Sequence, residues 1–146
     1  MSATVLLIED SKFIRITSQR ALTRAGYSVL MALDGEQGLR MAQESMPDVI
    51  LLDMMLPIIA GADVLRKLKD DKRTAHIPVI VLSSLSQKSS TKLKQRDVAG
   101  YIEKAALVSG DSKGIVQALQ AIAGPSAQVE EKTVGLVLPS PSPAAV

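Results

Sequence analysis

The chain has 146 residues, of which 47% are hydrophobic and 22% charged, with a formal net charge of +2. This length suits one domain with a short extension, and the absence of Cys excludes disulfides, thiolate metal sites and cysteine nucleophiles. The small, evenly spread charge argues against a domain that binds nucleic acid directly, and no apolar run approaches the roughly 20 residues of a membrane span.

The N-terminal third contains two candidate strand–helix units. Residues 5–8 form a wholly apolar run, which is typical of a strand buried on both faces of a parallel sheet. Ser11 is expected to cap a helix that continues to about Ala25 and ends at Gly26. No basic segment precedes the first run, so we expect no cleaved signal peptide and a cytoplasmic location.

The second unit begins with a weaker candidate strand over residues 27–31. Asp34 followed by Gln37 resembles a capping box, and Pro47 is expected to end the helix that it starts. The expected apolar face of this helix contains Leu39, Ala42 and Met46.

The middle of the chain repeats the design. A strand is predicted over residues 49–52, and the carboxylate of Asp53 follows it directly. A third helix is marked by Val64, Leu65 and Leu68. The fourth strand is predicted over residues 79–82, with Ser83 immediately after it.

The last part of the domain has weaker signals. Residues 86–96 form a polar candidate helix, and residues 99–102 a candidate strand that precedes Glu103 and Lys104. A final amphipathic helix is marked by Ile115, Val116, Leu119, Ile122 and Ala123. We therefore expect a domain over residues 1–123 and a Pro/Ser/Ala-rich linker or tail over residues 124–146, which holds four of the seven prolines.

Five alternating strand–helix pairs predict an α/β fold, an open parallel sheet with helices on both faces. In such a sheet all carboxyl ends of the strands lie at one edge, where ligands bind. The residues at that edge are Glu9, Asp10, Asp53, Ser83 and Lys104. A single Asp there is usually a helix cap or turn former, and a single Lys a solvated surface charge. Three neighbouring carboxylates, however, repel one another unless a cation such as Mg²⁺ neutralises them, so the set favours metal-assisted phosphoryl transfer.

Together these residues resemble a known family. Glu9 and Asp10, Asp53 with Pro57 and Gly61 beyond it, Ser83, Tyr101 and Lys104 occur in the order and spacing of response-regulator receiver domains, including the chemotaxis regulators. The resemblance implies a flavodoxin-like, doubly wound five-stranded parallel sheet of order 2-1-3-4-5 with five helices. That order would bring Asp10 and Asp53 together at the switch point.

The resemblance also implies roles for the residues. Asp53 would be the phosphoacceptor, Lys104 and Ser83 would contact the phosphoryl group, and Ser83 and Tyr101 would form the switch. Mg²⁺, or Mn²⁺ in its place, would be held by Asp10, Asp53 and the backbone carbonyl of Met55, with Glu9 acting through water. The implied partners are a histidine kinase or phosphotransfer protein and a downstream protein or effector domain. Such a domain assists only its own phosphorylation and dephosphorylation and is not otherwise an enzyme.

One departure keeps an alternative open. Family members usually carry proline after the residue that matches Lys104, often with a cis bond, whereas this chain has Ala105. A cis bond before a non-proline residue costs about 2.5–4 kcal/mol, so a trans bond and a differently shaped loop are expected. The alternative is a receiver-like interaction module that does not depend on phosphorylation. A flavin- or nucleotide-binding protein would need a glycine-rich phosphate loop after the first strand, and an aspartate-nucleophile phosphatase a second acid at position 55; both are disfavoured.

Overall fold

The computed structural model describes residues 3–83, 97–108 and 113–123. Five strands form one sheet of order β2-β1-β3-β4-β5, and every neighbouring pair is parallel. The strands are β1 (Thr4–Ile8), β2 (Ser28–Ala32), β3 (Val49–Asp53), β4 (Val79–Ser83) and β5 (Gly100–Glu103). The predicted fold class and strand order are confirmed.

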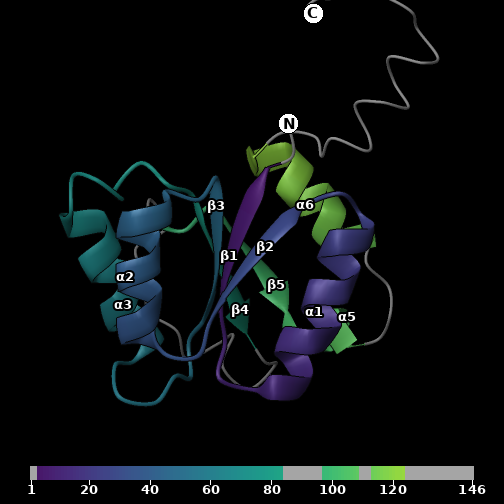
Figure 1. Cartoon of the computed structure of the whole chain (residues 1–146), viewed down its shortest axis with the longest axis horizontal. Coiled ribbons are helices and arrows are strands. Elements are labelled where there is room, and N and C mark those ends of the chain that lie inside the picture. The colour runs from purple at the N-terminus through teal and green to yellow at the C-terminus, as the bar shows by residue number, and fades with distance from the viewer. Residues whose placement is uncertain (1–2, 84–96, 109–112, 124–146) are drawn as a thin grey trace, which may run out of the picture.

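Helices cover both faces of the sheet (Figure 1). Helices α2 (Gly35–Ser45) and α3 (Gly61–Asp70) lie on one face. Helices α1 (Lys12–Arg24), α5 (Lys104–Val108) and α6 (Lys113–Ala123) lie on the other. None of these described helices is long and apolar enough to cross a membrane.

Two hydrophobic clusters form the core, one on each face of the sheet. Successive residues of a strand point to opposite faces, so Leu6 and Ile8 pack in the cluster of α2 and α3, whereas Val5 and Leu7 pack with Leu22 of α1. Both sets are fully buried. The sheet is therefore covered on both sides, which explains why its three central strands, β1, β3 and β4, are built around continuous apolar runs.

Local capping interactions agree with the sequence. The Ser11 hydroxyl accepts a hydrogen bond from the Ile14 N–H at 3.4 Å, and α1 is followed by Gly26 with φ 99°. The Asp34 carboxylate accepts from the Gln37 N–H at 2.8 Å, which caps α2. The Gln37 side chain in turn accepts from the Leu33 N–H at 2.6 Å, so the reciprocal bond involves the residue before the cap.

Two expectations about helix ends are corrected. Met46 does not belong to the apolar face of α2: the helix ends at Ser45, and Met46 is its C-cap in the left-handed conformation with φ 48°, which leaves its side chain exposed. A short helix, α5, begins at Lys104, where a loop was expected. Ala and Leu are strong helix formers, and the buried side chain of Leu107 joins the core beside α1.

Some expectations concern residues that the structure does not describe. The predicted helix over residues 86–96 and the tail over residues 124–146 lie outside the described part of the chain. There are no cis peptide bonds in the described segments, so the bond between Lys104 and Ala105 is trans, as expected.

Candidate functional site

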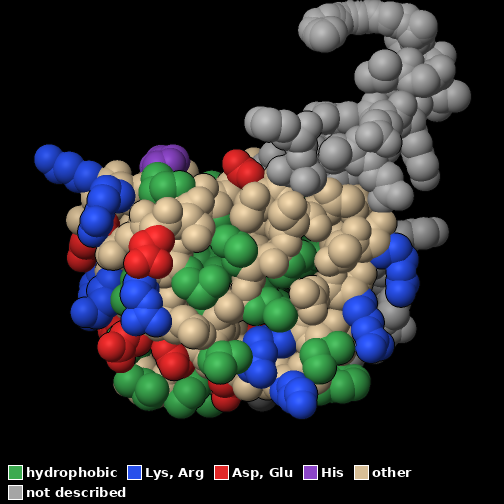
Figure 2. Space-filling model, in the orientation of Figure 1, with side chains coloured by type: hydrophobic (Ala, Val, Ile, Leu, Met, Phe, Trp, Pro, Cys, Tyr) green, Lys and Arg blue, Asp and Glu red, His purple; other side chains and the backbone are tan. Residues whose placement is uncertain are grey.

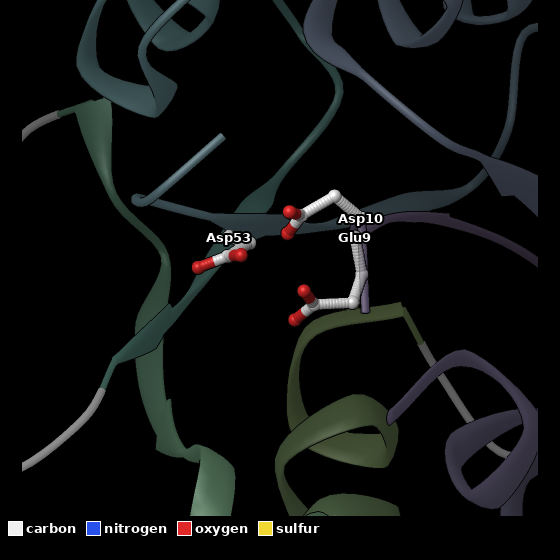
Figure 3. Close-up of side chains that lie close together, drawn as sticks. All are labelled: Glu9, Asp10 and Asp53. Atoms are coloured by element: carbon white, nitrogen blue, oxygen red, sulfur yellow. The ribbon is translucent and has the colours of Figure 1, made fainter. Parts of the chain in front are cut away.

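The acidic site lies where β1 and β3 end side by side. Asp53 is the last residue of β3, and Glu9 and Asp10 follow β1 directly. Each of the three residues offers a carboxylate oxygen, and these oxygens lie within 4.8 Å of one another. Figure 3 shows the side chains of Glu9 and Asp10 extending from the end of β1 toward the region of Asp53. The expected meeting of Asp10 and Asp53 is confirmed.

Burial differs among the three acids. Asp53 and Glu9 are fully buried, whereas Asp10 is exposed. The Glu9 carboxylate accepts a hydrogen bond from the Ser11 N–H at 3.1 Å, which holds it at the start of α1. The site therefore combines two acids removed from solvent with one that solvent can reach.

Lys104 supplies a cation to this cluster. Its Nζ lies 2.7 Å from Asp53 Oδ1 and 3.6 Å from Glu9 Oε1. Because α5 starts at Lys104 with no intervening loop after β5, the side chain begins at the same sheet edge as the acids. The trans bond to Ala105 thus does not keep Lys104 from its expected position near Asp53.

The electrostatics of the site are dominated by burial. Loss of solvation is the main reason that the pKa of Glu9 rises from 4.5 to about 8, and the neighbouring Asp53 carboxylate contributes to the rise. The Ser11 N–H and the Lys104 ammonium lower the Glu9 pKa, but by less. Near neutral pH, Glu9 therefore holds a proton in the absence of a bound cation.

Some buried carboxylate oxygens at this edge have no hydrogen-bond partner among the described residues. Asp53 Oδ1 accepts from the Met55 N–H at 3.1 Å and contacts Lys104, whereas Asp53 Oδ2 and Glu9 Oε1 have no hydrogen-bond partner among the described residues. A buried carboxylate oxygen without a partner is costly, and a hard divalent cation satisfies it well. The residues present therefore fit a Mg²⁺ ion.

The two predicted switch residues lie on neighbouring strands. Ser83 ends β4, is buried, and its hydroxyl has no hydrogen-bond partner in the described part of the chain. Tyr101 lies on β5 opposite Val81 in the register, and Ser83 lies opposite Glu103. Because alternate residues of a strand share a face, Ser83 and Tyr101 are on the same face of the sheet. The Tyr101 side chain is 48% exposed.

One residue at the site was not identified from the sequence. Arg15 of α1 donates hydrogen bonds from Nη1 to the carbonyl oxygens of Glu9, at 3.0 Å, and Asp10, at 2.8 Å. The only sequence signal for it is a cation one turn into the helix that follows two acids. An arginine in such a place is more often a surface charge, so this signal alone would not have distinguished it.

A family comparison identifies the domain type. A family model described as the response regulator receiver domain matches residues 5–110. Two longer relatives match only part of their length. The response regulator PleD of Caulobacter vibrioides is 44% identical over 85 residues, which cover 58% of this chain and 19% of PleD. The DNA-binding dual master transcriptional regulator RpaA of Synechocystis is 42% identical over 83 residues, which cover 57% of this chain and 34% of RpaA.

Shorter relatives match over most of their length. The polar-differentiation response regulator DivK of Brucella ovis is 31% identical over 105 residues, which cover 71% of this chain and 85% of DivK. The structure of Vibrio cholerae chemotaxis protein CheY4 has a TM-score of 0.69 at 25% identity, covering 84% of this chain and 99% of that one. The receiver domain of the sensor histidine kinase PA1611 of Pseudomonas aeruginosa, solved with magnesium in its active-site cleft, has a TM-score of 0.72 at 22% identity, covering 85% and 99%.

Proposed function

The chain belongs to the response regulator receiver domain family, and from this premise we propose that Asp53 accepts a phosphoryl group from a histidine kinase or phosphotransfer protein. A phosphorus–nitrogen bond of the donor breaks, and a bond forms between phosphorus and a carboxylate oxygen of Asp53, which gives an acyl phosphate. Phosphorylation then changes a surface that a downstream partner recognises. The domain catalyses no reaction other than its own phosphorylation and dephosphorylation.

The observation that carries this proposal is the pairing of the buried Asp53 with Lys104 beside two further acids. The 2.7 Å contact with Lys104 orients the Asp53 carboxylate, and its Oδ2 has no hydrogen-bond partner among the described residues. Once a phosphoryl group is attached, the Lys104 ammonium is close enough to neutralise one of its oxygens. A set of residues that only formed turns would not require a lysine paired to a buried carboxylate.

Three acids near one another support a bound Mg²⁺, for which Mn²⁺ would be a substitute. Asp10 and Asp53 would hold it with the Met55 carbonyl, and Glu9 would act through water. When bound, the ion would neutralise charge on the acids and on the phosphoryl oxygens. Glu9 must lose its proton as the cation binds, because a protonated carboxyl cannot act as an anionic partner.

We further propose that Ser83 and Tyr101 transmit phosphorylation to the partner surface. The Ser83 hydroxyl, unpaired within the described segments, is available to donate to a phosphoryl oxygen, and Tyr101 lies on the same face of the sheet one strand away. Movement of Ser83 toward the phosphoryl group would make room for a different Tyr101 rotamer. The equilibrium shifts only by the difference in free energy between the two arrangements.

We expect the output of this domain to be contact with another protein. Figure 2 shows Lys and Arg side chains in separate groups on the face in view. From the small net charge of +2 we expect this domain to contact protein and not nucleic acid. DNA binding is a property of RpaA, of which the matched segment is about a third. We expect the residues over 124–146 to link this domain to, or to extend it toward, its downstream partner.

The deciding experiment is intact-protein mass after incubation with acetyl phosphate and Mg²⁺, with Asp53→Asn as the control variant. We expect the mass of one phosphoryl group to be added to the wild-type chain. The addition should be absent without Mg²⁺ and absent in D53N, which retains the shape of the side chain but not its nucleophilic carboxylate.

A second measurement separates the proposal from its alternative. Some receivers accept phosphate only from their own kinase, so a negative result is followed by ¹⁹F NMR with a beryllofluoride phosphoryl mimic. Binding of the mimic supports the phosphoacceptor. If neither the phosphoryl group nor the mimic binds, the domain is a phosphorylation-independent interaction module.

A further inference from the structure

Arg15 connects helix α1 to the loop that carries two of the three acids. It lies in the first turn of α1, and its guanidinium turns back to the loop. One nitrogen, Nη1, donates to the two successive carbonyl oxygens of Glu9 and Asp10 at 3.0 and 2.8 Å. Both distances are those of well-formed hydrogen bonds, and a charged donor strengthens them.

We propose that Arg15 is a positioning residue for the divalent-cation site, an inference that rests on the proposed function. It fixes the backbone of Glu9 and Asp10 so that both carboxylates face Asp53. It touches neither the phosphoryl group nor the cation, and it acts only through the loop.

The two acids depend on this contact to different degrees. Glu9 has other anchors: its N–H donates to the Ala32 carbonyl at 3.1 Å, and its carboxylate accepts from the Ser11 N–H. Asp10 is exposed, so packing restrains its side chain little and its direction follows from the backbone. The 2.8 Å bond from Arg15 to the Asp10 carbonyl is therefore the contact that matters most for the metal ligand on the open side of the site.

The direction in which the Mg²⁺ affinity changes on removal of Arg15 distinguishes a positioning role from an effect of its charge. Arg15 is a cation close to a site for another cation, so its charge alone disfavours Mg²⁺ binding. Removing that charge without any change in geometry would leave the Mg²⁺ affinity unchanged or higher. A lower affinity after removal of Arg15 can only come from the lost alignment of the acids.

The test is a Mg²⁺ titration of the full ¹⁵N-labelled chain followed by the amide shifts of Asp10 and Ser11. For Arg15→Ala we expect a dissociation constant about tenfold higher than that of the wild type, the lower end of the range for groups that orient metal ligands. Arg15→Lys should lie between the two, because an ammonium on a flexible stem replaces the rigid fork of the guanidinium. Arg20→Ala removes an exposed cation from the same helix and should leave the affinity unchanged or slightly higher.

Each outcome decides one question. If R15A binds Mg²⁺ as tightly as the wild type or more tightly, the positioning role is wrong. If R15A does not fold, R15K decides: a Mg²⁺ affinity equal to that of the wild type overturns the role, and a weaker one supports it.

A wild-type chain with no saturable response to Mg²⁺ would overturn both the metal site and this inference. If the wild type binds Mg²⁺ and gains a phosphoryl group, and R15A binds Mg²⁺ with the same affinity, this inference alone is overturned.

Discussion

The loops that follow β1 and β3 lie at the same edge of the sheet, because the two strands are parallel neighbours. Different interactions stabilise the two loops. In the first loop, hydrogen bonds from the Arg15 guanidinium and the Ser11 N–H hold the backbone and the carboxylate of Glu9. In the second, backbone packing determines the shape, and the apolar side chains of Met55 and Ile58 are 63% and 78% exposed. The first loop thus sets the geometry of charges, and the second presents an apolar surface beside them.

Close backbone packing in the loop after β3 is concentrated at Gly61. A Cβ at this position would lie 2.5 Å from the Met54 Cα and would also overlap the Asp53 carbonyl oxygen. Neither atom can move without moving Asp53, the proposed phosphoacceptor. The loop therefore tolerates no side chain at the first residue of α3.

The largest effect is expected for Gly61→Ala. The overlap with backbone should lower the free energy of unfolding by about 3 kcal/mol, measured by urea denaturation, and impair phosphoryl uptake. Gly114→Ala in α6 is the matched control, since a Cβ there has nothing within 4 Å. That variant should gain up to about 1 kcal/mol from helix propensity. Equal stability of G61A and the wild type would show that backbone packing does not shape this loop.

The loop after β1 is expected to make stability depend on pH, because burial raises the pKa of Glu9 to about 8. Between about pH 4.5, its value without burial, and pH 8, the folded chain holds a proton that the unfolded chain has released. The free energy of unfolding should therefore fall as pH rises through this range, by at most about 1.4 kcal/mol per pH unit, and level off above it.

The measurement is urea denaturation between pH 6 and 8 in EDTA, with Glu9→Gln as the comparison. Gln has the same shape and does not titrate. The free energy of unfolding should therefore fall more steeply with pH for the wild type than for E9Q, and the difference is the contribution of this one proton. Over this interval we expect a difference of about 2 kcal/mol. Parallel slopes for the two proteins would contradict the raised pKa.

The smallest effect concerns Ile58, which adopts φ 70° although it is a β-branched residue. A side chain of this kind in the left-handed region is strained by roughly 1–2 kcal/mol. Because Ile58 is mostly exposed, Ile58→Asn loses little burial and should raise the free energy of unfolding by about 1 kcal/mol. Met55 is exposed in the same loop but does not have a positive φ, so Met55→Asn should not raise the free energy of unfolding. A similar rise for both variants would point to the removal of an exposed apolar side chain and not to relief of backbone strain.

Most of the fold and the acidic part of the site could be predicted from residue patterns. Strands buried on both faces are continuous apolar runs, and a parallel sheet brings their carboxyl ends to one edge. For this reason the sequence positions of Glu9, Asp10 and Asp53 predict one shared edge, and the strand order that places β1 beside β3 came from the family resemblance. Helix starts at Ser11 and Asp34 were also predictable, because capping depends on residues three positions apart.

Other features depend on contacts that are distant or ambiguous in the sequence. The left-handed C-cap at Met46 and the helix that begins at Lys104 involve residues whose local preferences allow more than one conformation. The role of Arg15 depends on the direction in which a long side chain turns from its helix. A surface arginine and one that bonds two loop carbonyls have the same sequence pattern.

The sequence by itself determined the edge of the sheet at which the acids gather. Its motifs, through their resemblance to a known family, also determined the expected strand order and the identity of the candidate phosphoacceptor. Periodicity and strand ends are local properties, so residue spacing alone is sufficient to predict them. Only the tertiary structure decided that the Lys104 ammonium contacts Asp53 although the peptide bond to Ala105 is trans. It also decided that Glu9 is fully buried and that the Arg15 guanidinium bonds the loop after β1. These features depend on burial and on distances between segments far apart in the chain, and both arise only when the helices pack on the sheet.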